Sequence, residues 1–345
     1  MVMKVHRNVS LAEHSTMRLG GLAAYLTEVS RLSEVEEAVA WAGQHQVLVM
    51  MIGSGSNIVW GDGGYPGLVI VNQIMGFETT QEENNAVLVR IGGGENWDHA
   101  VERTVGMSLH GIESLSLIPG TAGATPVQNV GAYGQEIANT LVNVETYDTQ
   151  AKKFVTIMAA DCGFGYRTSR FKTTDKGRFF ITAINLRLAR GNPKPPFYQS
   201  VQDYFSAHAT TDITPQAVRQ AVIAIRTSKL PDPAKVANNG SFFQNPVIGT
   251  KQFAELAANY PDMTHWTVGD SQVKVAAGWL VEKAGFKDMH DKETGMATWP
   301  AQALVLVNEH ARSTADLLKF RQKIIDKVQE MFGLTLVQEP ELIGE

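Results

Sequence analysis

The sequence has little of what several common kinds of site are built from. It contains one cysteine, Cys162, which excludes an internal disulfide framework and a zinc site made of cysteine ligands. A lone thiol is typically a small buried residue, and the scarcity of cysteine fits a reducing compartment. Lysine and arginine (30) are fewer than aspartate and glutamate (35), and no basic stripe is visible. The chain therefore lacks the electrostatic footprint of a nucleic-acid-binding protein.

Long apolar segments are also missing. No uninterrupted apolar run approaches the ~20 residues that a membrane-spanning helix needs. The opening residues, MVMKVHRNVSLAEHS, lack the apolar stretch of a signal peptide. We therefore expect a cytoplasmic protein that has neither a membrane nor a nucleic acid as a partner. The default expectation is a monomer without a metal site.

Two familiar nucleotide fingerprints are absent. No G-x-x-x-x-G-K-[ST] segment occurs, which excludes a P-loop NTPase. The pairs Gly53-x-Gly55 and Gly92-x-Gly94 are followed by isoleucine and tryptophan where a Rossmann turn needs its third glycine. Glycine must therefore serve another purpose in this chain.

Glycine is concentrated in three places, residues 53–57 (GSGSN), 92–94 (GGG) and 116–134 (SLIPGTAGATPVQNVGAYG). The last stretch holds four glycines, two prolines and no charged side chain. Because glycine has no Cβ, backbone N–H groups in such loops can approach an anion closely. Any single cluster has an ordinary interpretation as turn glycines. The three together favour a large, mostly neutral ligand that carries a diphosphate, such as FAD.

The hydrophobic pattern alternates between strands and helices, which indicates an α/β or α+β fold. Predicted strands cover residues 47–52, 67–71, 87–91 and 303–307, and predicted helices cover 95–105, 273–284, 313–332 and a segment that begins at Thr214-Pro215. A further helix is predicted from a capping box, with Ser33 as the N-cap and Glu36 as its partner.

Nine motifs follow one another along nearly the whole chain. They are GSGSN (53–57), GGENW (93–97), IPGTAGA (118–124), QNVGAYG (128–134), GYRTSRF (165–171), KLPDP (229–233), GSFFQNP (240–246), AAGWL (276–280) and QALVLVN (302–308). In this order they resemble the UDP-N-acetylenolpyruvoylglucosamine reductases, also called UDP-N-acetylmuramate dehydrogenases. These flavoenzymes complete UDP-N-acetylmuramic acid in peptidoglycan synthesis. Each motif is weak alone, and the ordered set is specific.

The resemblance implies an α+β fold with a PCMH-type FAD-binding domain of two α/β subdomains, residues 1–75 and 76–228. An α+β substrate-binding domain, residues 229–330, and a tail, residues 331–345, that returns to the active site are expected to follow. In the family the glycine loops hold the FAD diphosphate and line the flavin. The implied cofactor-binding residues are Gly53, Ser54, Gly55, Ser56, Asn57, Pro119, Gly120, Gly123, Ala124, Gly131 and Tyr133.

The implied reaction has two halves: NADPH reduces FAD, and the flavin then gives a hydride to the vinyl carbon of an enolpyruvyl ether. Negative charge develops at C2 and in its carboxylate, so a cation and a proton donor are needed. Arg167 matches the cation, because a guanidinium grips a carboxylate with two hydrogen bonds. Ser241 matches the proton donor. Glu341 matches the family's C-terminal glutamate, with Glu339 as the alternative because two family residues are missing before Ile343.

The substrate residues follow from the same resemblance. Lys229 is expected to bind a phosphate, and Asn245 and Gln302 to hydrogen-bond the nucleotide-sugar. Tyr198 resembles the substrate tyrosine of the longer family subtype, which closes a tyrosine loop over the substrate. Trp266 stands where that subtype has its second tyrosine, so it can stack on uracil but offers no phenol hydroxyl. Gln244 replaces a frequent lysine.

Two rival functions remain open at this level. One is another PCMH-type FAD oxidoreductase with a different substrate, against which only the motifs from Lys229 onward argue. The other is a non-catalytic protein that binds a nucleotide-sugar. The joint presence of Arg167 and Ser241 argues against that second rival.

Overall fold

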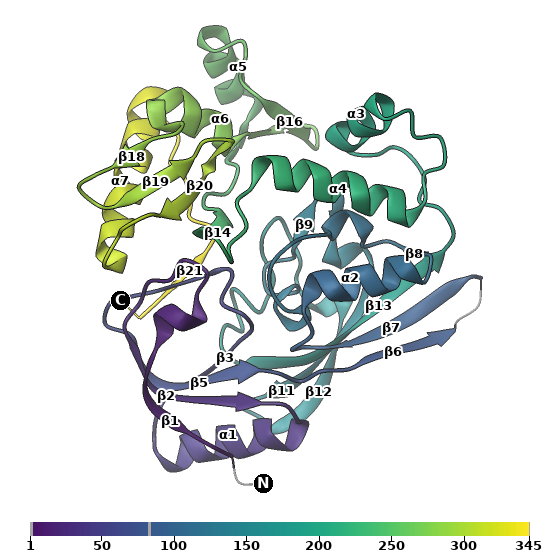
Figure 1. Cartoon of the computed structure of the whole chain (residues 1–345), viewed down its shortest axis with the longest axis vertical. Helices are drawn as coiled ribbons and strands as arrows, with labels where there is room; N and C mark the ends of the chain where they lie inside the picture. The colour runs from purple at the N-terminus through teal and green to yellow at the C-terminus, as the bar shows by residue number, and fades with distance from the viewer. Residues whose placement is uncertain (1–2, 82–83, 345) are drawn as a thin grey trace. The chain divides into compact units, whose positions relative to one another are not determined.

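The computed structural model describes residues 3–81 and 84–344, which divide into two compact units (Figure 1). The first unit holds the described residues of Met1–Val9, Ala23–Gly55 and Tyr65–Ser228. The second combines those of Ser10–Leu22, Ser56–Gly64 and Lys229–Glu345. Both units mix helices with sheets that are mainly antiparallel, so the α+β class is confirmed.

The two units cut across the four segments expected from the sequence. Residues 10–22 and 56–64, expected in the first cofactor subdomain, belong to the second unit, and so does the tail from residue 331. Strand pairing is the physical reason: β4 (Ile58–Trp60) pairs in parallel with β21 (Glu341–Ile343). The functional roles of the four segments stay a prediction.

A four-stranded sheet opens the first unit, in the order β1-β2-β5-β3. Its strands are β1 (His6–Ser10), β2 (Leu22–Val29), β5 (Tyr65–Asn72) and β3 (Val49–Ile52). Because β5 runs parallel to both β2 and β3, the chain needs a crossover, which is helix α1 (Leu32–Gln44). The helix covers one face of the sheet, where Val35 and Ala38 pack in one core with Leu68 (Figure 1).

The second sheet of this unit is antiparallel, in the order β12-β11-β13-β7-β6, with β8 pairing to β13. Its strands are β12 (Lys153–Met158), β11 (Leu141–Asp148), β13 (Phe179–Arg190), β7 (Ala86–Gly92), β6 (Phe77–Gln81) and β8 (Leu109–His110). Helix α2 (Trp97–Gly106) begins where the Asn96 side chain accepts the His99 amide, and its Trp97 joins the core of this sheet.

The neutral stretch at residues 116–134 runs through this unit with little regular structure. It contains the short helix η3 (Ala122–Ala124) and leads into the two-stranded ribbon of β9 (Gly131–Ala132) and β10 (Gln135–Glu136). Further along the chain, α3 (Gln199–Ala207) and α4 (Pro215–Lys229) pack together through Phe205 and Val222. Tyr133 packs against this helical pair and so ties the loop to it.

Two antiparallel sheets form the second unit, in the orders β14-β20-β19-β18 and β15-β17-β16. The strands are β14 (Ala237–Ser241), β20 (Gln302–Asn308), β19 (Met296–Trp299), β18 (His290–Asp291), β15 (Val247–Gly249), β17 (Gln272–Val275) and β16 (His265–Val268). The helices are α5 (Thr250–Asn259), α6 (Ala277–Val281) and α7 (Thr314–Phe332). The core combines Leu280, Leu306 and Phe320 with Val59 from the distant β4.

Most predicted elements are confirmed, including α7, whose N-cap is Ser313 and whose C-cap is Gly333 in the left-handed conformation. Two predictions are wrong. The first helix begins at Leu32, because Glu34 rather than Glu36 accepts the amides of Ser30 (2.7 Å) and Arg31 (3.1 Å).

The second wrong prediction is the helix at residues 273–284. Residues 272–275 form strand β17, because Val273 and Val275 alternate with a less buried Lys274 and match a half-buried strand. Helix α6 starts only at Ala277. Among the described residues, each helix is too short or too polar to cross a lipid bilayer.

Candidate active site

The glycine clusters meet inside the first unit. The amide of Gly123 donates to the carbonyl of Gly93 (2.9 Å), and the amide of Ala122 donates to the carbonyl of Glu95 (2.9 Å). A Cβ on Gly123 would lie 3.0 Å from the Gly93 Cα, so glycine permits an approach that a larger residue would prevent. Main-chain hydrogen bonds therefore hold the neutral loop against the second glycine cluster.

Thr121, in the third glycine cluster, has its side chain against Gly53 of the first cluster. A Cβ built on Gly53 would overlap the Oγ1 atom of Thr121. That hydroxyl is buried and has no hydrogen-bond partner among the described residues. Leaving a buried polar group unpaired costs about 1–3 kcal/mol, so such an atom calls for an explanation. A glycine-lined cradle with one unsatisfied hydroxyl fits the diphosphate of FAD, which Gly53, Gly120 and Thr121 would hold.

Arg167 lies against the end of the neutral loop. Its Nη2 donates to the carbonyl oxygen of Gly131 (2.9 Å), and its guanidinium stands 5.4 Å from the ring centre of Tyr166. The backbone of Arg167 has φ of +53°, which costs energy for any residue other than glycine. Backbone strain of this kind persists only where surrounding contacts enforce it, and it gathers at functional sites.

Asn129 hydrogen-bonds the main chain two residues before Arg167. Its buried amide donates to the Glu136 carboxylate (2.8 Å) and to the Gly165 carbonyl (3.1 Å), while its oxygen accepts the Ala138 amide (3.2 Å). One side chain thus ties the neutral loop to the segment that carries Arg167.

Tyr133 and Tyr198 lie edge to face, with ring centres 5.7 Å apart. Tyr133 is in the left-handed region (φ +47°), and Tyr198 precedes α3 and is 39% exposed. Burial raises the pKa of both phenols. The structure thus places a predicted cofactor residue beside a predicted substrate residue.

In the second unit, Ser241 ends strand β14 opposite Val305 of β20. The pairing is irregular between Asn238 and Ser241, because Gly240 has φ of +71° and its amide donates to the Asn238 side chain (2.8 Å). This irregularity leaves Ser241 half-buried rather than enclosed in the sheet.

The C-terminal tail returns to this strand. The Glu339 amide donates to the carbonyl of Phe242 (2.9 Å), directly after Ser241. Two residues further on, the Glu341 amide donates to the carbonyl of Asn57 (2.9 Å), and Glu341 pairs with Ile58 as β21 begins. Both candidate glutamates are therefore held by their backbone, close to predicted catalytic or cofactor residues.

Asn239 joins these segments through its side chain. Its Nδ2 donates to Oγ1 of Thr16 (3.1 Å), to the carbonyl of Ser56 (3.1 Å) and, less closely, to that of Ile58 (3.3 Å). The residue is only 7% exposed, and its Oδ1 is buried without a partner among the described residues. Asn239 therefore fixes the strand of Ser241 to the end of the first glycine loop.

Asn245 and Gln302 converge on the first turn of α6. The Asn245 oxygen accepts the Ala277 amide (2.8 Å). A Cβ on Gly278 would lie 2.7 Å from the Gln302 Oε1, so this glycine makes room for the amide. Both side chains are half-buried. In the structure both amide oxygens accept main-chain N–H groups, Asn245 that of Ala277 and Gln302 that of Leu304 (3.3 Å).

Trp266 and Lys229 lie elsewhere in the second unit. Trp266, in β16, pairs with Lys274 of β17, whose ammonium is 5.7 Å from its ring. Lys229 is exposed at the end of α4.

The predicted residues thus form two groups, each within one unit. The first unit carries Gly53, Ser54, Gly55, Pro119, Gly120, Gly123, Ala124, Gly131, Tyr133, Arg167 and Tyr198, and the second carries Ser56, Asn57, Lys229, Ser241, Asn245, Trp266, Gln302 and Glu341.

Sequence reasoning missed three side chains of these groups, Thr121, Asn129 and Asn239. Thr121 and Asn129 fall inside quoted motifs, and Asn239 directly precedes one. The available signal was a small polar residue within two positions of a glycine. The sequence alone could not reveal that these side chains are buried or where their hydrogen bonds go.

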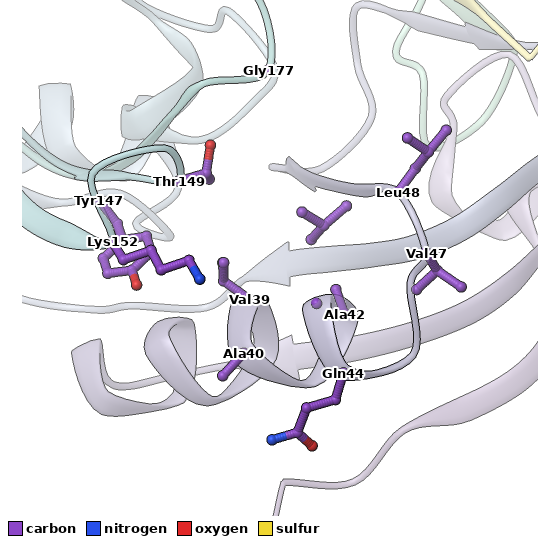
Figure 2. Close-up of a pocket in the computed structure, with 12 residues that line it drawn as sticks. Val39, Ala40, Ala42, Gln44, Val47, Leu48, Tyr147, Thr149, Lys152 and Gly177 are labelled. Carbon is purple, nitrogen blue, oxygen red and sulfur yellow. The ribbon is translucent and has the colours of Figure 1, made fainter.

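Two other features stand apart. A cavity of about 760 Å³ lies between α1 and the turn that joins β11 to β12, where Lys152 extends toward the helix (Figure 2). Its described lining includes none of the predicted site residues.

Cys162 is buried, as expected, and burial raises the pKa of its thiol to about 11, which suppresses thiolate reactivity. No group of three potential metal ligands occurs among the described residues.

Comparison with known proteins gives the class first. A family model described as an FAD binding domain matches residues 23–153, which include all three glycine clusters. A second model, for the C-terminal domain of UDP-N-acetylenolpyruvoylglucosamine reductase, matches residues 232–343. The chain is therefore a flavin-binding protein with a second domain of a defined kind.

Full-length relatives give the family. The chain is 36% identical to the UDP-N-acetylenolpyruvoylglucosamine reductase of Chromobacterium violaceum over 99% of both chains. It is 38% identical to that of Cupriavidus pinatubonensis over 97% of this chain and 98% of the relative. The chain belongs to the UDP-N-acetylenolpyruvoylglucosamine reductase family, which confirms the resemblance; membership of the longer subtype stays a prediction.

Solved structures agree on the fold. The crystal structure of UDP-N-acetylenolpyruvylglucosamine reductase from Thermus caldophilus matches with a TM-score of 0.67 over 99% of both chains, at 21% identity. A 6-hydroxy-D-nicotine oxidase from Arthrobacter nicotinovorans matches with a TM-score of 0.53 over 99% of this chain and 89% of its own, at 11% identity. At these identities the likeness supports the fold alone.

Proposed function

We propose that the protein is an FAD-dependent reductase that uses NADPH to convert UDP-N-acetyl-3-O-(1-carboxyvinyl)-glucosamine into UDP-N-acetylmuramate, a step of peptidoglycan synthesis. The observation that carries the proposal is identity of 36–38% to reductases of this name over nearly the full length of both chains. The relatives cover both units, so they support the substrate as well as the cofactor. This favours the proposal over an FAD oxidoreductase that shares only the first unit.

FAD fits the glycine-lined cradle of the first unit, where Gly53, Gly120 and Thr121 would hold it. When bound, it supplies a two-electron carrier between NADPH and the vinyl carbon of the substrate. Residues 53–57 and 116–134 carry no charged side chain, so these two loops would surround the flavin ring without placing an ion beside it. Control of charge is then left to a few side chains.

Arg167 is proposed to stabilise the negative charge that develops on the substrate carboxylate. The Gly131 carbonyl accepts a hydrogen bond from one nitrogen of its guanidinium and holds it in place, and a guanidinium can bind both oxygens of a carboxylate. Preorganised donors stabilise a developing charge without reorganisation during the reaction. The strained backbone of Arg167 supports this role, because the tertiary structure maintains an unfavourable conformation there.

Ser241 is proposed to donate the proton to C2 of the substrate. The irregular end of β14 leaves its hydroxyl half-buried and able to meet a ligand. Glu341 is proposed to assist that transfer or polarise the charge, and β21 holds its backbone. Lys229, Asn245, Gln302, Tyr198 and Trp266 are proposed to bind the nucleotide-sugar, and we propose a cytoplasmic monomer.

Replacing Ser241 with alanine tests the proposal. We expect Ser241→Ala to remain yellow and to be reduced by NADPH at the wild-type rate, while reoxidation by the enolpyruvyl nucleotide-sugar slows about 10²–10⁴-fold, as for loss of a general acid. Anaerobic stopped-flow mixing separates the two half-reactions. Ser206→Ala, on the exposed side of α3, is the control.

Other outcomes would contradict parts of the proposal. Two unchanged half-reactions would remove Ser241 from the mechanism. A yellow wild type that NADPH reduces, but that no enolpyruvyl nucleotide-sugar reoxidises, would favour the rival FAD oxidoreductase. A colourless wild type that does not take up FAD would favour the non-catalytic binding protein.

A further inference from the structure

Two side chains link the ends of the neutral glycine-rich loop. Glu113 precedes the loop in the sequence, and Gln135 follows it. The Nε2 atom of Gln135 donates to Oε1 of Glu113 (2.9 Å), and the Ser114 amide donates to Oε1 of Gln135 (2.8 Å). The other carboxylate oxygen of Glu113 accepts the Gly111 amide. We call the Glu113–Gln135 pair with these hydrogen bonds the loop clasp.

The donors and acceptors of the loop clasp match in one way. The main-chain N–H of Ser114 can only donate, so Gln135 turns its oxygen toward Ser114 and its amino group toward Glu113. Glu113 then faces two donors, the Gln135 amino group and the Gly111 amide, and it needs two acceptor oxygens. A carboxylate has two acceptor oxygens, and a glutamine amide has one. Position 113 therefore requires glutamate as long as position 135 is glutamine.

The burial of Glu113 makes this arrangement costly. The residue is 1% exposed, and both of its hydrogen-bonding partners in the clasp are neutral. A buried carboxyl group costs folding free energy unless its oxygens find donors, and an apolar residue would avoid that cost. What the carboxyl group does here, and an apolar residue could not do, is bind a side chain 22 positions further along the chain.

Other contacts fix each end of the loop separately. Nε1 of Trp97 donates to the carbonyl of Leu115 (3.0 Å) at the first end, and the Ile137 amide donates to the carbonyl of Val130 (2.8 Å) near the far end. Neither of these two bonds joins one end to the other, as the clasp does. A loop that is joined at its ends has fewer conformations to lose when a ligand binds.

The main chain between the joined ends carries much of the predicted cofactor site. It includes Thr121 of the proposed cradle and Gly131, whose carbonyl oxygen holds Arg167. Gly131 pairs with Glu136, which directly follows Gln135 in the ribbon of β9 and β10. The clasp therefore holds the strand against which Gly131 is placed.

We propose that Glu113 and Gln135 are positioning residues for the cofactor, and that their clasp holds the neutral loop in the conformation that binds FAD. This inference rests on the FAD site of the proposed function. Neither side chain needs to touch FAD, because each acts through the main chain that it holds. A preorganised loop pays less conformational entropy on binding, so the closed clasp strengthens the retention of FAD.

The test uses two single variants and their combination in the full-length protein. Glu113→Gln sets two donors against each other, and Gln135→Glu sets two carboxyl groups against each other. The combined variant, Glu113→Gln with Gln135→Glu, restores the match. Its new amide at position 113 accepts from Gly111 and donates to the new carboxylate at position 135, which also accepts the Ser114 amide.

Two further variants complete the set. Gln135→Met, at a half-buried position, opens the clasp without adding a charge and serves if a single variant does not fold. The matched control is Gln322→Glu, which sets a carboxylate against Asp326 on the exposed face of α7.

We expect each single variant to release FAD about tenfold faster on dilution, the order for one lost buried hydrogen bond, as followed by flavin fluorescence. In the protein freed of FAD, the amides of Ala122 and Gly123 should exchange hydrogen faster than in the wild type, while amides shared by β11 and β13 should keep their rate. The combined variant should return both measurements to the wild-type values, and the control should not change them.

Three results would overturn the inference. One is wild-type release of FAD from the single variants and from Gln135→Met. Another is a combined variant that releases FAD as fast as the single variants do. The third is an equal rise in exchange across the whole first unit, which would make the pair a general stabiliser. A wild type that takes up no FAD would instead contradict the proposed function.

Discussion

The two units hold their candidate residues by different means. In the first unit, one continuous stretch, residues 116–136, supplies most of them, and short main-chain hydrogen bonds such as Gly123 to Gly93 keep it in place. In the second unit, Thr16, Ser56, Asn239 and Glu341 come from four distant segments. One buried amide and one pair of parallel strands connect them.

Because of this difference, different kinds of substitution should damage the candidate site residues of the two units. A site made of backbone depends on the absence of side chains, so adding a methyl group is the damaging change. A site made of assembled segments depends on particular polar groups, so changing one atom type is enough to disturb it. The four predictions that follow test this contrast, from the largest expected effect to the smallest.

Replacing Glu341 with glutamine has the largest expected effect. Glutamine keeps the shape and the backbone pairing of β21 but cannot carry a charge or pass on a proton, so turnover should fall about a hundredfold. Glu339→Gln should cost much less. Steady-state kcat and KM, with FAD content as the control, decide between them. The reverse order would mean that Glu339 is the catalytic glutamate and that the match to the family's tail is shifted by two residues.

Asn239→Asp should destabilise the protein by about 2 kcal/mol near neutral pH, because a carboxylate would face the oxygens of Thr16 and Ser56 that now accept hydrogen bonds. Urea denaturation followed by circular dichroism measures the change. Asn259→Asp, at an exposed position of α5, is the control. Equal stability of the two variants would show that Asn239 does not hold the segments together.

Gly53→Ala should speed loss of FAD about tenfold, equivalent to ~1.4 kcal/mol, because the added methyl group collides with Thr121. Combining it with Thr121→Ala should recover part of the loss, since the colliding hydroxyl is then removed. Gly43→Ala, whose added methyl group would meet no atom of the described residues within 4 Å outside its own helix, is the control. Flavin fluorescence on dilution is the measurement. Normal FAD retention in Gly53→Ala would contradict the proposed cradle.

The smallest expected effect is that of breaking the ion pair between Asp148 and Arg178 in the first unit. Hydrogen bonds from Arg178 hold the pKa of Asp148 at about 2, against about 3.9 for an unfolded aspartate. Because the folded pKa is depressed, this pair stabilises the protein above pH ~4, and the contribution disappears as the pH falls toward 2. Asp148→Asn should therefore cost about 1 kcal/mol at pH 7 and nearly nothing at pH 2.

Urea denaturation at several pH values measures this difference. The exposed Asp161→Asn is the control and should show no such dependence. A destabilisation of Asp148→Asn that stays constant between pH 7 and pH 2 would contradict the role given to Arg178.

Local patterns predicted much of the fold, and they failed where two local signals competed. Helix α7 was predictable because Ser313 and Gly333 are strong end signals on either side of an amphipathic run. Helix α1 was misplaced because two glutamates, Glu34 and Glu36, are both available for capping. Its start depends on which of them reaches the amide of Ser30.

The candidate site divides in the same way. Arg167 and Ser241 could be named because each lies in a motif whose neighbours are as informative as the residue itself. Asn239 and Thr121 could not be named. Each has a buried oxygen that finds no hydrogen-bond partner among the described residues, the amide oxygen of Asn239 and the hydroxyl of Thr121. Whether a polar atom finds a partner depends on residues that are distant in the sequence, so the neighbouring residues do not reveal it.

The sequence by itself determined the glycine-rich loops, the helix ends and the ordered motifs, because these depend on the conformational freedom of individual residues and on short-range periodicity. Only the tertiary structure decided that the tail pairs with residues 58–60, that one asparagine joins three segments, and that the Thr121 hydroxyl is buried without a partner among the described residues. Those outcomes depend on which distant groups share a buried space, where each polar atom must find a partner.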